Sequence, residues 1–103
     1  VVPAMTEKIR NVSRTLFEKE PVVLGPKVYD LIPMGILNPF EIGSDLVANA
    51  AAAYFKYKRH CIIVDFGTAL TFTTVSGTGE ILGVSIAPGL KTAIRSLSQN
   101  TAK

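Results

Sequence analysis

The sequence predicts a small α/β fold, and two features of its apolar pattern support this. Helical apolar stripes alternate with short apolar runs in the first half, and three β-rich runs followed by a last helical stripe fill the second half. The composition agrees with a folded domain, because 48% of the 103 residues are hydrophobic and 18% are charged. The predicted order is strand, helix, strand, helix, three strands and a helix, which is typical of an α/β protein.

The chain opens with the pattern of a strand followed by a helix. Val1 and Val2 look like the end of a strand, and apolar residues recurring at helical spacing predict a helix over residues 3–18. Residues 21–25 then predict a short buried strand. Residues 29–36 predict an irregular connection, because Pro and Gly interrupt their apolar run.

The main helix is predicted to follow a capped start. Asn38 suits the N-cap, Pro39 suits the first helical position, and Glu41 can reach back as in a capping box. Gly43 is expected to break or kink this turn. An apolar stripe over residues 42–57 predicts the main helix itself.

The second half predicts an antiparallel β-meander. Its turns contain Gly and Thr, and a Pro-Gly pair separates the last strand from the final helix. The three predicted strands and the final helix span residues 61–65, 69–75, 81–86 and 90–97. A meander followed by helices is similar to the opening of each half of the ribonuclease H-like folds, where the end of the first strand and the next turn face a phosphate cleft.

The composition argues against zinc-binding, disulfide-rich and membrane-spanning proteins. Cys61 is the only cysteine, which excludes an internal disulfide and fits a reducing compartment. Because Cys61 begins an apolar run, we expect a buried, inert thiol rather than a nucleophile. His60 is the only histidine, so no Cys/His ligand pair can hold structural zinc. No apolar run approaches the roughly 18 residues that a membrane span needs.

The net charge of +3 is modest, and its one local basic run contains Lys56, Lys58 and Arg59. At the end of a predicted helix such cations complement the helix dipole. A nucleic-acid surface is the alternative, but the chain offers no base-stacking platform or recognition helix, so direct nucleic-acid binding is not expected.

The chain has no initiator Met and no signal peptide, and it begins as if in mid-strand, so we expect a fragment of a longer cytoplasmic protein.

Asp65, Gly67 and Thr68 form the first candidate site, because an apolar strand here delivers a carboxylate to a Gly-Thr turn. Gly67 lets backbone N–H groups approach a phosphate, and Thr68 adds a hydroxyl donor. Asp65 would repel phosphate, so it would need a cation between itself and the phosphate oxygens. The alternative is a hairpin in which Asp65 only caps the turn.

Asp45 and the segment 87–89 are the other candidates. Asp45 falls in the first turn of the main helix, where it either compensates the helix dipole or acts as a general base toward a substrate hydroxyl. The preceding Gly43 leaves room for a substrate against the backbone. Residues 87–89 open the last helix, whose N-terminus can bind an anion, although their Pro-Gly pair can also be only a turn.

These sites, taken together and in this order, resemble the type III pantothenate kinases, also known as the Bvg accessory factor family. The resemblance covers almost the whole chain. It rests on Val-Val-Pro at 1–3, Asn-Pro-x-Glu-x-Gly-x-Asp at 38–45, Asn-Ala at 49–50, Ile-Val-Asp-Phe-Gly-Thr-Ala-x-Thr-Phe at 63–72, Gly-x-x-Ile-x-Pro-Gly at 83–89 and Thr-Ala at 101–102.

The resemblance implies a fold of the acetate and sugar kinase/Hsp70/actin superfamily, built from two ribonuclease H-like halves, of which this chain is a fragment. Residues 1–60 would end the first half, and residues 61–103 would open the second with the meander and a helix. The implied reaction is ATP-dependent phosphorylation of pantothenate to 4'-phosphopantothenate, the first step of coenzyme A biosynthesis. The implied enzyme is a homodimer that uses Mg²⁺ and a monovalent cation, K⁺ or NH₄⁺.

The resemblance also implies roles for individual residues. Asp45 aligns with the proton acceptor, Asp65 with the ligand of the monovalent cation, and Thr68 with a contact to the ATP phosphates, beside Gly67. The implied pantothenate-binding residues are Gly43, Ser44, Asp45, Leu46 and Ile36.

Two positions depart from the family pattern. The family usually has Arg where this chain has Leu46, and Tyr where it has Ile36. Losing an Arg that binds the pantothenate carboxylate would remove a charge-assisted hydrogen bond worth about 1.5–3 kcal/mol. The alternatives are therefore a rearranged pocket, a related kinase with another small hydroxylated substrate, or a non-catalytic transcriptional regulator of the same family. The family's N-terminal phosphate loop is missing from the chain, so we expect the 103 residues alone to lack kinase activity.

Overall fold

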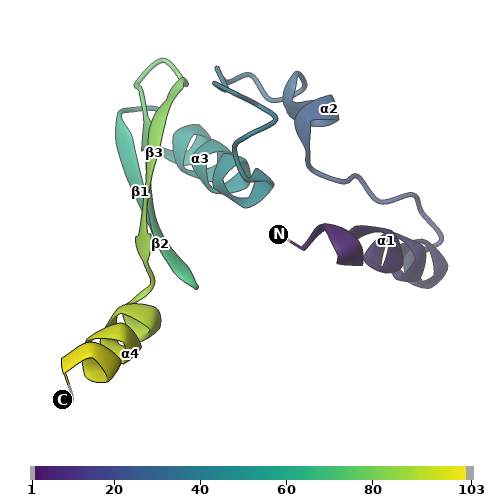
Figure 1. The fold of residues 1–103 in the computed structure, drawn as a ribbon. Helices are drawn as coiled ribbons and strands as arrows, with labels where there is room; N and C mark the ends of the chain where they lie inside the picture. The colour runs from purple at the N-terminus through teal and green to yellow at the C-terminus, as the bar shows by residue number, and fades with distance from the viewer. Residues whose placement is uncertain (1, 102–103) are drawn as a thin grey trace.

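The computed structural model describes residues 2–101, and its helices and strands follow one another as shown in Figure 1. In chain order the elements are α1 (Pro3–Phe17), α2 (Pro26–Tyr29), α3 (Ser44–Tyr57), β1 (Cys61–Phe66), β2 (Ala69–Val75), β3 (Ile81–Pro88) and α4 (Leu90–Thr101). The predicted α/β class is confirmed. The strand end predicted at Val1 and the chain end at residues 102–103 lie outside the described residues.

The three strands form one antiparallel sheet in the order β1-β2-β3, which confirms the predicted meander. Both outer strands run longer than predicted, to Phe66 and Pro88. Asp65 pairs with Thr71 across β1 and β2, and Thr71 pairs with Ile86 across β2 and β3. Cross-strand partners share one face of a sheet, so these three side chains lie on the same face.

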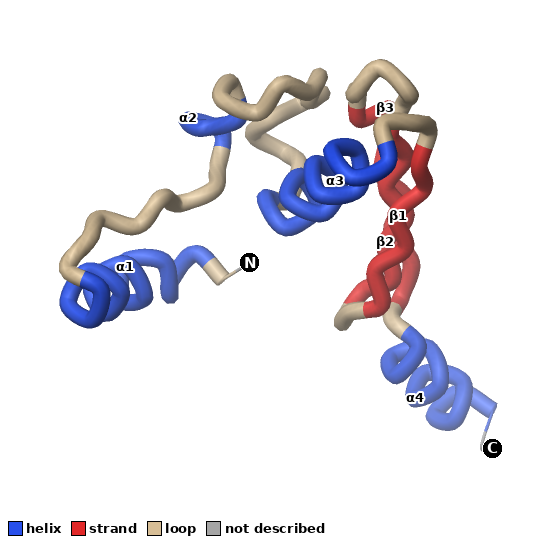
Figure 2. Tube along the Cα trace, turned by 180° about the vertical axis from the view of Figure 1, so that it is seen from behind, coloured by secondary structure: helices blue, strands red, loops and turns tan. Residues whose placement is uncertain are grey.

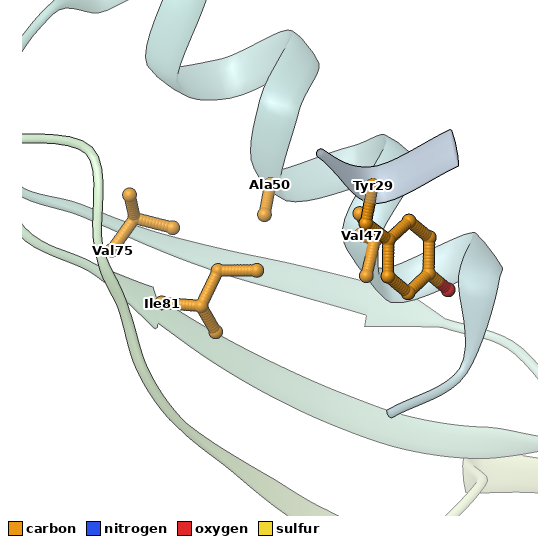
Figure 3. Close-up of a cluster of buried hydrophobic side chains, with 5 residues drawn as sticks. All are labelled: Tyr29, Val47, Ala50, Val75 and Ile81. Carbon is orange, nitrogen blue, oxygen red and sulfur yellow. The ribbon is translucent and has the colours of Figure 1, made fainter. Parts of the chain in front are cut away.

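Helix α3 packs on one face of the sheet and supplies the centre of the hydrophobic core (Figure 3). Val47 and Ala50 of α3 are fully buried against Val75 and Ile81, and Tyr29 of α2 completes the cluster. The alanines of α3 allow this close approach, because their side chains end at Cβ. Burying one Val or Ile side chain is worth about 1.5–3 kcal/mol, so this small cluster is the main source of stability in the unit.

The outer helices lie apart from this core. Figures 1 and 2 show α1 and α4 at opposite ends of the molecule, with the sheet and α3 between them. Neither helix has a buried residue. The radius of gyration is 16.9 Å, compared with about 13 Å for a compact domain of 100 residues, so the described chain is extended. Among residues 2–101, no helix has both the length and the apolar composition that crossing a membrane requires.

The short strand predicted after α1 is wrong. Residues 21–25 form no strand, because no other strand of the described chain lies beside them, and Val22 is 82% exposed. Val2 has an extended backbone but serves as the N-cap residue of α1. The irregular connection predicted over residues 29–36 is largely confirmed, although its first residue ends the short helix α2.

The predicted capped helix start is also wrong. The Asn38 carbonyl accepts hydrogen bonds from the N–H groups of Glu41 (2.9 Å) and Ile42 (3.1 Å), which closes a single turn rather than a helix. An N-cap residue needs an extended backbone, whereas Asn38 has a left-handed φ of 50°. Helix α3 begins only at Ser44, with Gly43 as its N-cap, so the break expected at Gly43 is confirmed.

The basic run lies at the end of α3, as predicted. Lys58 follows the helix in a left-handed conformation, and its N–H donates to the Tyr54 carbonyl at 2.8 Å. The Lys58 ammonium lies 4.8 Å from the Tyr54 ring centre and 4.3 Å from that of Phe55. Tyr57, the last residue of the predicted apolar stripe and of α3, is 56% exposed.

Candidate active site

Asp65 is held at the end of β1 on the sheet face that α3 covers. Residues of β1 are alternately half-buried and exposed, so Cys61, Ile63 and Asp65 share one face. Cys61 is half-buried rather than fully enclosed as predicted, and its thiol donates to the Arg59 carbonyl at 3.1 Å. The strand therefore carries apolar residues inward along its length and places one carboxylate at the edge of the helix–sheet interface.

Asn49 of α3 is the direct partner of Asp65. Its side-chain amide donates to Oδ2 of Asp65 at 3.0 Å in a half-buried position. Asn49 lies four residues after Asp45, and residues four apart lie on the same side of a helix. Helix α3 therefore carries both Asp45 and the partner of Asp65. No role was predicted for Asn49, although an amide within an apolar, alanine-rich helical stripe is a signal in the sequence.

The hydroxyl oxygen of Thr71 is buried and has no hydrogen-bond partner among residues 2–101. It belongs to the residue opposite Asp65 in the β1–β2 register, and Cβ atoms of such pairs lie about 4.5–5.5 Å apart. A buried, unpartnered oxygen beside a carboxylate suits a hard cation or a water molecule. No role was predicted for Thr71 either, although the alternation of β2 places it on this face.

The turn formed by Gly67 and Thr68 packs against the start of α4. The N–H of Gly89 donates to the Thr68 carbonyl at 3.1 Å. A Cβ atom at position 89 would overlap the Thr68 oxygen and would lie 2.6 Å from the Gly67 oxygen. The candidate site at the Gly67-Thr68 turn and the candidate anion site at residues 87–89 are therefore adjacent. The N–H of Gly67 donates to the Ala69 carbonyl at 3.0 Å, so the exposed Thr68 side chain, rather than this N–H, is available to a ligand.

Asp45 is exposed in the first turn of α3, as predicted. Its carboxylate lies over Gly43, because a Cβ atom at position 43 would be 2.5 Å from Asp45 Oδ1. Burial raises the pKa of Tyr29, and the negative charge of Asp45 raises it further. Gly43, Asp45 and the Tyr29 phenol therefore share one corner of the molecule, where only a glycine leaves the carboxylate in its present position.

The other predicted substrate residues are not all in one place. Leu46 is buried and lines, together with Gly43, a cavity of about 370 Å³ between α3 and β3. Ile36 packs against the core outside that cavity, and Ser44 is half-buried at the start of α3. Glu41 is the one ionisable residue among the described residues that line the cavity. Leu46 therefore adds an apolar side chain to the wall of this cavity.

The described residues contain no cluster of three or more His, Cys, Asp or Glu side chains that could hold a metal ion by itself. Asp65 and Thr71 can share a cation with water or phosphate oxygens but do not enclose one. Asp45, being exposed, can accept a proton from a bound molecule. The chemistry that this arrangement allows is proton acceptance at one helix turn and cation-assisted anion binding at the neighbouring strand end.

Comparison with known proteins gives matches over the whole chain. A family model described as Type III pantothenate kinase matches residues 1–103. The chain is 51% identical over 105 residues to the type III pantothenate kinase of Treponema pallidum (strain Nichols), and 42% identical over 103 residues to that of Dehalococcoides mccartyi (strain CBDB1). These alignments cover 100% of this chain but 38% and 39% of the two relatives. The chain therefore spans about two fifths of the length of the curated relatives it matches.

Proposed function

Because this chain belongs to the type III pantothenate kinase family, we propose that the full-length protein transfers a phosphoryl group from ATP to pantothenate. The product would be 4'-phosphopantothenate, in the first step of coenzyme A biosynthesis. The family resemblance inferred from the motifs is confirmed. The relatives are named for this reaction, and the residues of this chain support the roles proposed below.

The observation that carries the proposal is the hydrogen bond between Asn49 and Asp65. It joins α3, with Asp45 in its first turn, to the strand end that carries Asp65. Asp45 is exposed, whereas Asp65 is half-buried and paired with an amide. Two carboxylates in such different environments suit two different tasks in one phosphoryl transfer.

Asp45 is proposed as the general base. An exposed carboxylate can accept the proton of the pantothenate hydroxyl as its oxygen attacks phosphorus. Gly43 supports this role, because a side chain at that position would displace the Asp45 carboxylate. Ser44 and Leu46, on either side of Asp45, would form the rest of the pantothenate-binding loop.

Asp65 is proposed to hold a cation near the phosphates of ATP. A monovalent cation, K⁺ or NH₄⁺, would reduce the repulsion between carboxylate and phosphate, and Mg²⁺ would enter with the nucleotide. The unpartnered hydroxyl oxygen of Thr71 beside Asp65 fits such a group. At the adjacent turn, Gly67 leaves room for a phosphate and the Thr68 hydroxyl would donate to one of its oxygens, next to the N-terminus of α4.

The finer fold proposal is the acetate and sugar kinase/Hsp70/actin superfamily. The antiparallel order β1-β2-β3 followed by α4 supports residues 61–103 as the opening of a second ribonuclease H-like half. We further propose that the full-length protein is a cytoplasmic homodimer, as the resemblance implies. Sedimentation of the full-length protein tests the dimer, and a monomer at micromolar concentration would contradict it.

The function is tested with the full-length protein carrying Asp45→Asn, assayed for 4'-phosphopantothenate from ATP and pantothenate. Removing a general base should lower kcat by about a hundredfold to ten-thousandfold. Asp30→Asn, at an exposed position after α2, should leave kcat unchanged. Near wild-type turnover by Asp45→Asn would remove Asp45 from the base role. No turnover by the wild type would overturn the proposed function and favour the non-catalytic regulator.

Leu46 favours a second candidate, a related kinase that acts on another small hydroxylated substrate. Its side chain lines an apolar cavity at the position where the family pattern has Arg. Leu46→Arg in the full-length protein separates the two candidates. A pantothenate KM that falls about tenfold to hundredfold in Leu46→Arg would indicate that the natural substrate lacks a carboxylate at this place. An unchanged KM would retain pantothenate, with another group binding its carboxylate.

A further inference from the structure

Asn49 makes the one side-chain hydrogen bond that links α3 to the sheet within residues 2–101. Its neighbours on the helix, Val47 and Ala50, are apolar and fully buried, so packing against the sheet does not itself need an amide. A half-buried amide costs free energy unless it has a partner. Its partner here is one oxygen of the carboxylate at the end of β1.

This hydrogen bond fixes the direction of the Asp65 carboxylate. The terminal torsion of an Asp side chain is broad, so an unrestrained carboxylate points its oxygens in many directions. The Asn49 amide binds Oδ2, which leaves Oδ1 for a ligand. The unpartnered hydroxyl oxygen of Thr71 belongs to the cross-strand neighbour of Asp65, on the same face of the sheet.

The neutrality of Asn49 matters as much as its position. A Lys or Arg at this place would form an ion pair with Asp65 and would compete with any bound cation. An amide donates a hydrogen bond but carries no charge. Asn49 therefore orients the Asp65 carboxylate and leaves its full negative charge in place.

We propose that Asn49 is a positioning residue, which holds Asp65 through Oδ2 so that Oδ1 is presented to a cation that bridges to phosphate. The inference rests on the proposed kinase function, because it concerns the cation site of that reaction. Asn49 lies one turn after Asp45 on α3. The same helix therefore sets the proposed base and the proposed cation ligand relative to each other.

The test compares Asn49→Leu with Asn11→Leu in the full-length protein. Leu removes the amide at similar size, and Asn11 is an exposed residue of α1 outside the site. The readout is the rise in Tm with added KCl, at ionic strength held constant with choline chloride, in the presence of a non-hydrolysable ATP analogue. In Asn49→Leu the half-saturating KCl concentration should rise about tenfold or more, because a hydrogen bond to a charged group is lost. In Asn11→Leu this concentration should stay at the wild-type value. The pantothenate KM of both variants should stay within about twofold of the wild-type KM.

A double-variant cycle tests whether Asn49 acts through Asp65. Asp65→Asn should abolish the KCl-dependent rise in Tm, and adding Asn49→Leu to it should change the response no further. If Asn49→Leu lowers the Tm without KCl but keeps the wild-type half-saturating KCl, Asn49 is only a structural tie and the proposal is overturned. If Asn49→Leu does not fold, Asn49→Ser, which shortens the side chain beyond reach of Asp65, gives the same two readouts.

The outcomes separate this inference from the proposed function. A wild type that phosphorylates pantothenate, with a KCl response that survives Asn49→Leu, overturns the inference and leaves the function. A wild type that shows the KCl response and its loss in Asn49→Leu, but no phosphorylation of pantothenate, overturns the function and leaves the positioning role. A wild type without any KCl response overturns the inference whether or not it is a kinase.

Discussion

The unit formed by α3 and the meander differs from the two outer helices, α1 and α4, although all three helices carry apolar stripes. In the central unit the stripe of α3 meets the sheet and its central residues are fully buried. In the outer helices the large apolar side chains of the stripes are exposed, by 42–70%. These residues are Met5, Ile9, Val12, Leu16, Leu90, Ile94 and Leu97.

The difference shows that a helical stripe predicts a helix and its apolar face, but not the surface that covers that face. Helix α3 has the sheet beside it in the described chain, whereas α1 and α4 lie apart from it (Figures 1 and 2). The candidate site follows the same division. Asn49 and Asp65 belong to the central unit, and Thr68 and Gly89 lie where that unit meets α4.

The largest expected effect tests this comparison with the same substitution in both regions. Ile81→Ala, at a position 2% exposed, should lower the free energy of unfolding by about 2–5 kcal/mol, because it leaves a cavity in the core. Ile94→Ala on α4, at a position 67% exposed, should change it by less than about 0.5 kcal/mol. Urea unfolding of the 103-residue chain measures both. Equal costs would show that the stripe of α4 is covered in solution and would break the comparison.

The next effect concerns the junction between the two regions. Gly89→Ala should lower the free energy of unfolding by about 1–3 kcal/mol, because the added Cβ would overlap the Thr68 carbonyl oxygen. Gly83→Ala in β3 is the matched control, since a Cβ atom there meets nothing within 4 Å. The same urea unfolding compares the variants. A cost for Gly89→Ala no larger than that for Gly83→Ala would contradict the close contact at the turn.

A smaller effect should appear at alkaline pH, at the residue that joins α2 to the central unit. Burial and then the charge of Asp45 raise the pKa of Tyr29 above its ordinary value of 10.0. The folded protein therefore holds the phenol proton more tightly than the unfolded chain. This stabilisation is fully present below pH 10.0 and is lost as the pH rises through the folded pKa.

Tyr29→Phe should remove this dependence, so the free energy of unfolding should fall less steeply with rising pH than in the wild type. Tyr57→Phe, at an exposed position of α3, is the control and should keep the wild-type slope. Urea unfolding at a series of alkaline pH values gives the three slopes. Identical slopes for the wild type and Tyr29→Phe would show that the Tyr29 phenol is not buried beside Asp45 in solution.

Most of the fold could be predicted from the sequence where a pattern depends on local geometry. Helical and strand periodicity gave α1, α3, the meander and α4, because side-chain direction repeats with the backbone. The strand predicted at residues 21–25 failed because a strand needs a neighbour, which an apolar run does not supply. The capped start at Asn38 failed because the residue type was right for a cap but its backbone is left-handed.

The candidate site could be predicted in part, for a related reason. The motifs identified Asp45, Asp65 and Thr68 by residue type and order along the chain. The partners Asn49 and Thr71 could not be assigned, because their roles depend on how α3 lies on the sheet and on which oxygen is left unpartnered. Sequence motifs thus indicated the reacting groups, whereas the groups that position them required the packed structure.

The smallest expected effect belongs to the outer region, where local ion pairs take the place of packing. Arg14 donates two hydrogen bonds to Glu20, at 2.6 and 2.9 Å, and these lower the pKa of Glu20. The stabilisation is present above the ordinary value of 4.5 and is lost as the pH falls through the lowered pKa. Because both side chains are exposed, water and salt screen the pair.

Glu20→Gln should therefore leave the Tm at neutral pH almost unchanged, with Glu18→Gln as the control. A clear drop for Glu20→Gln alone that vanishes in about 1 M salt would show that this pair, rather than packing, holds the segment after α1 to the helix.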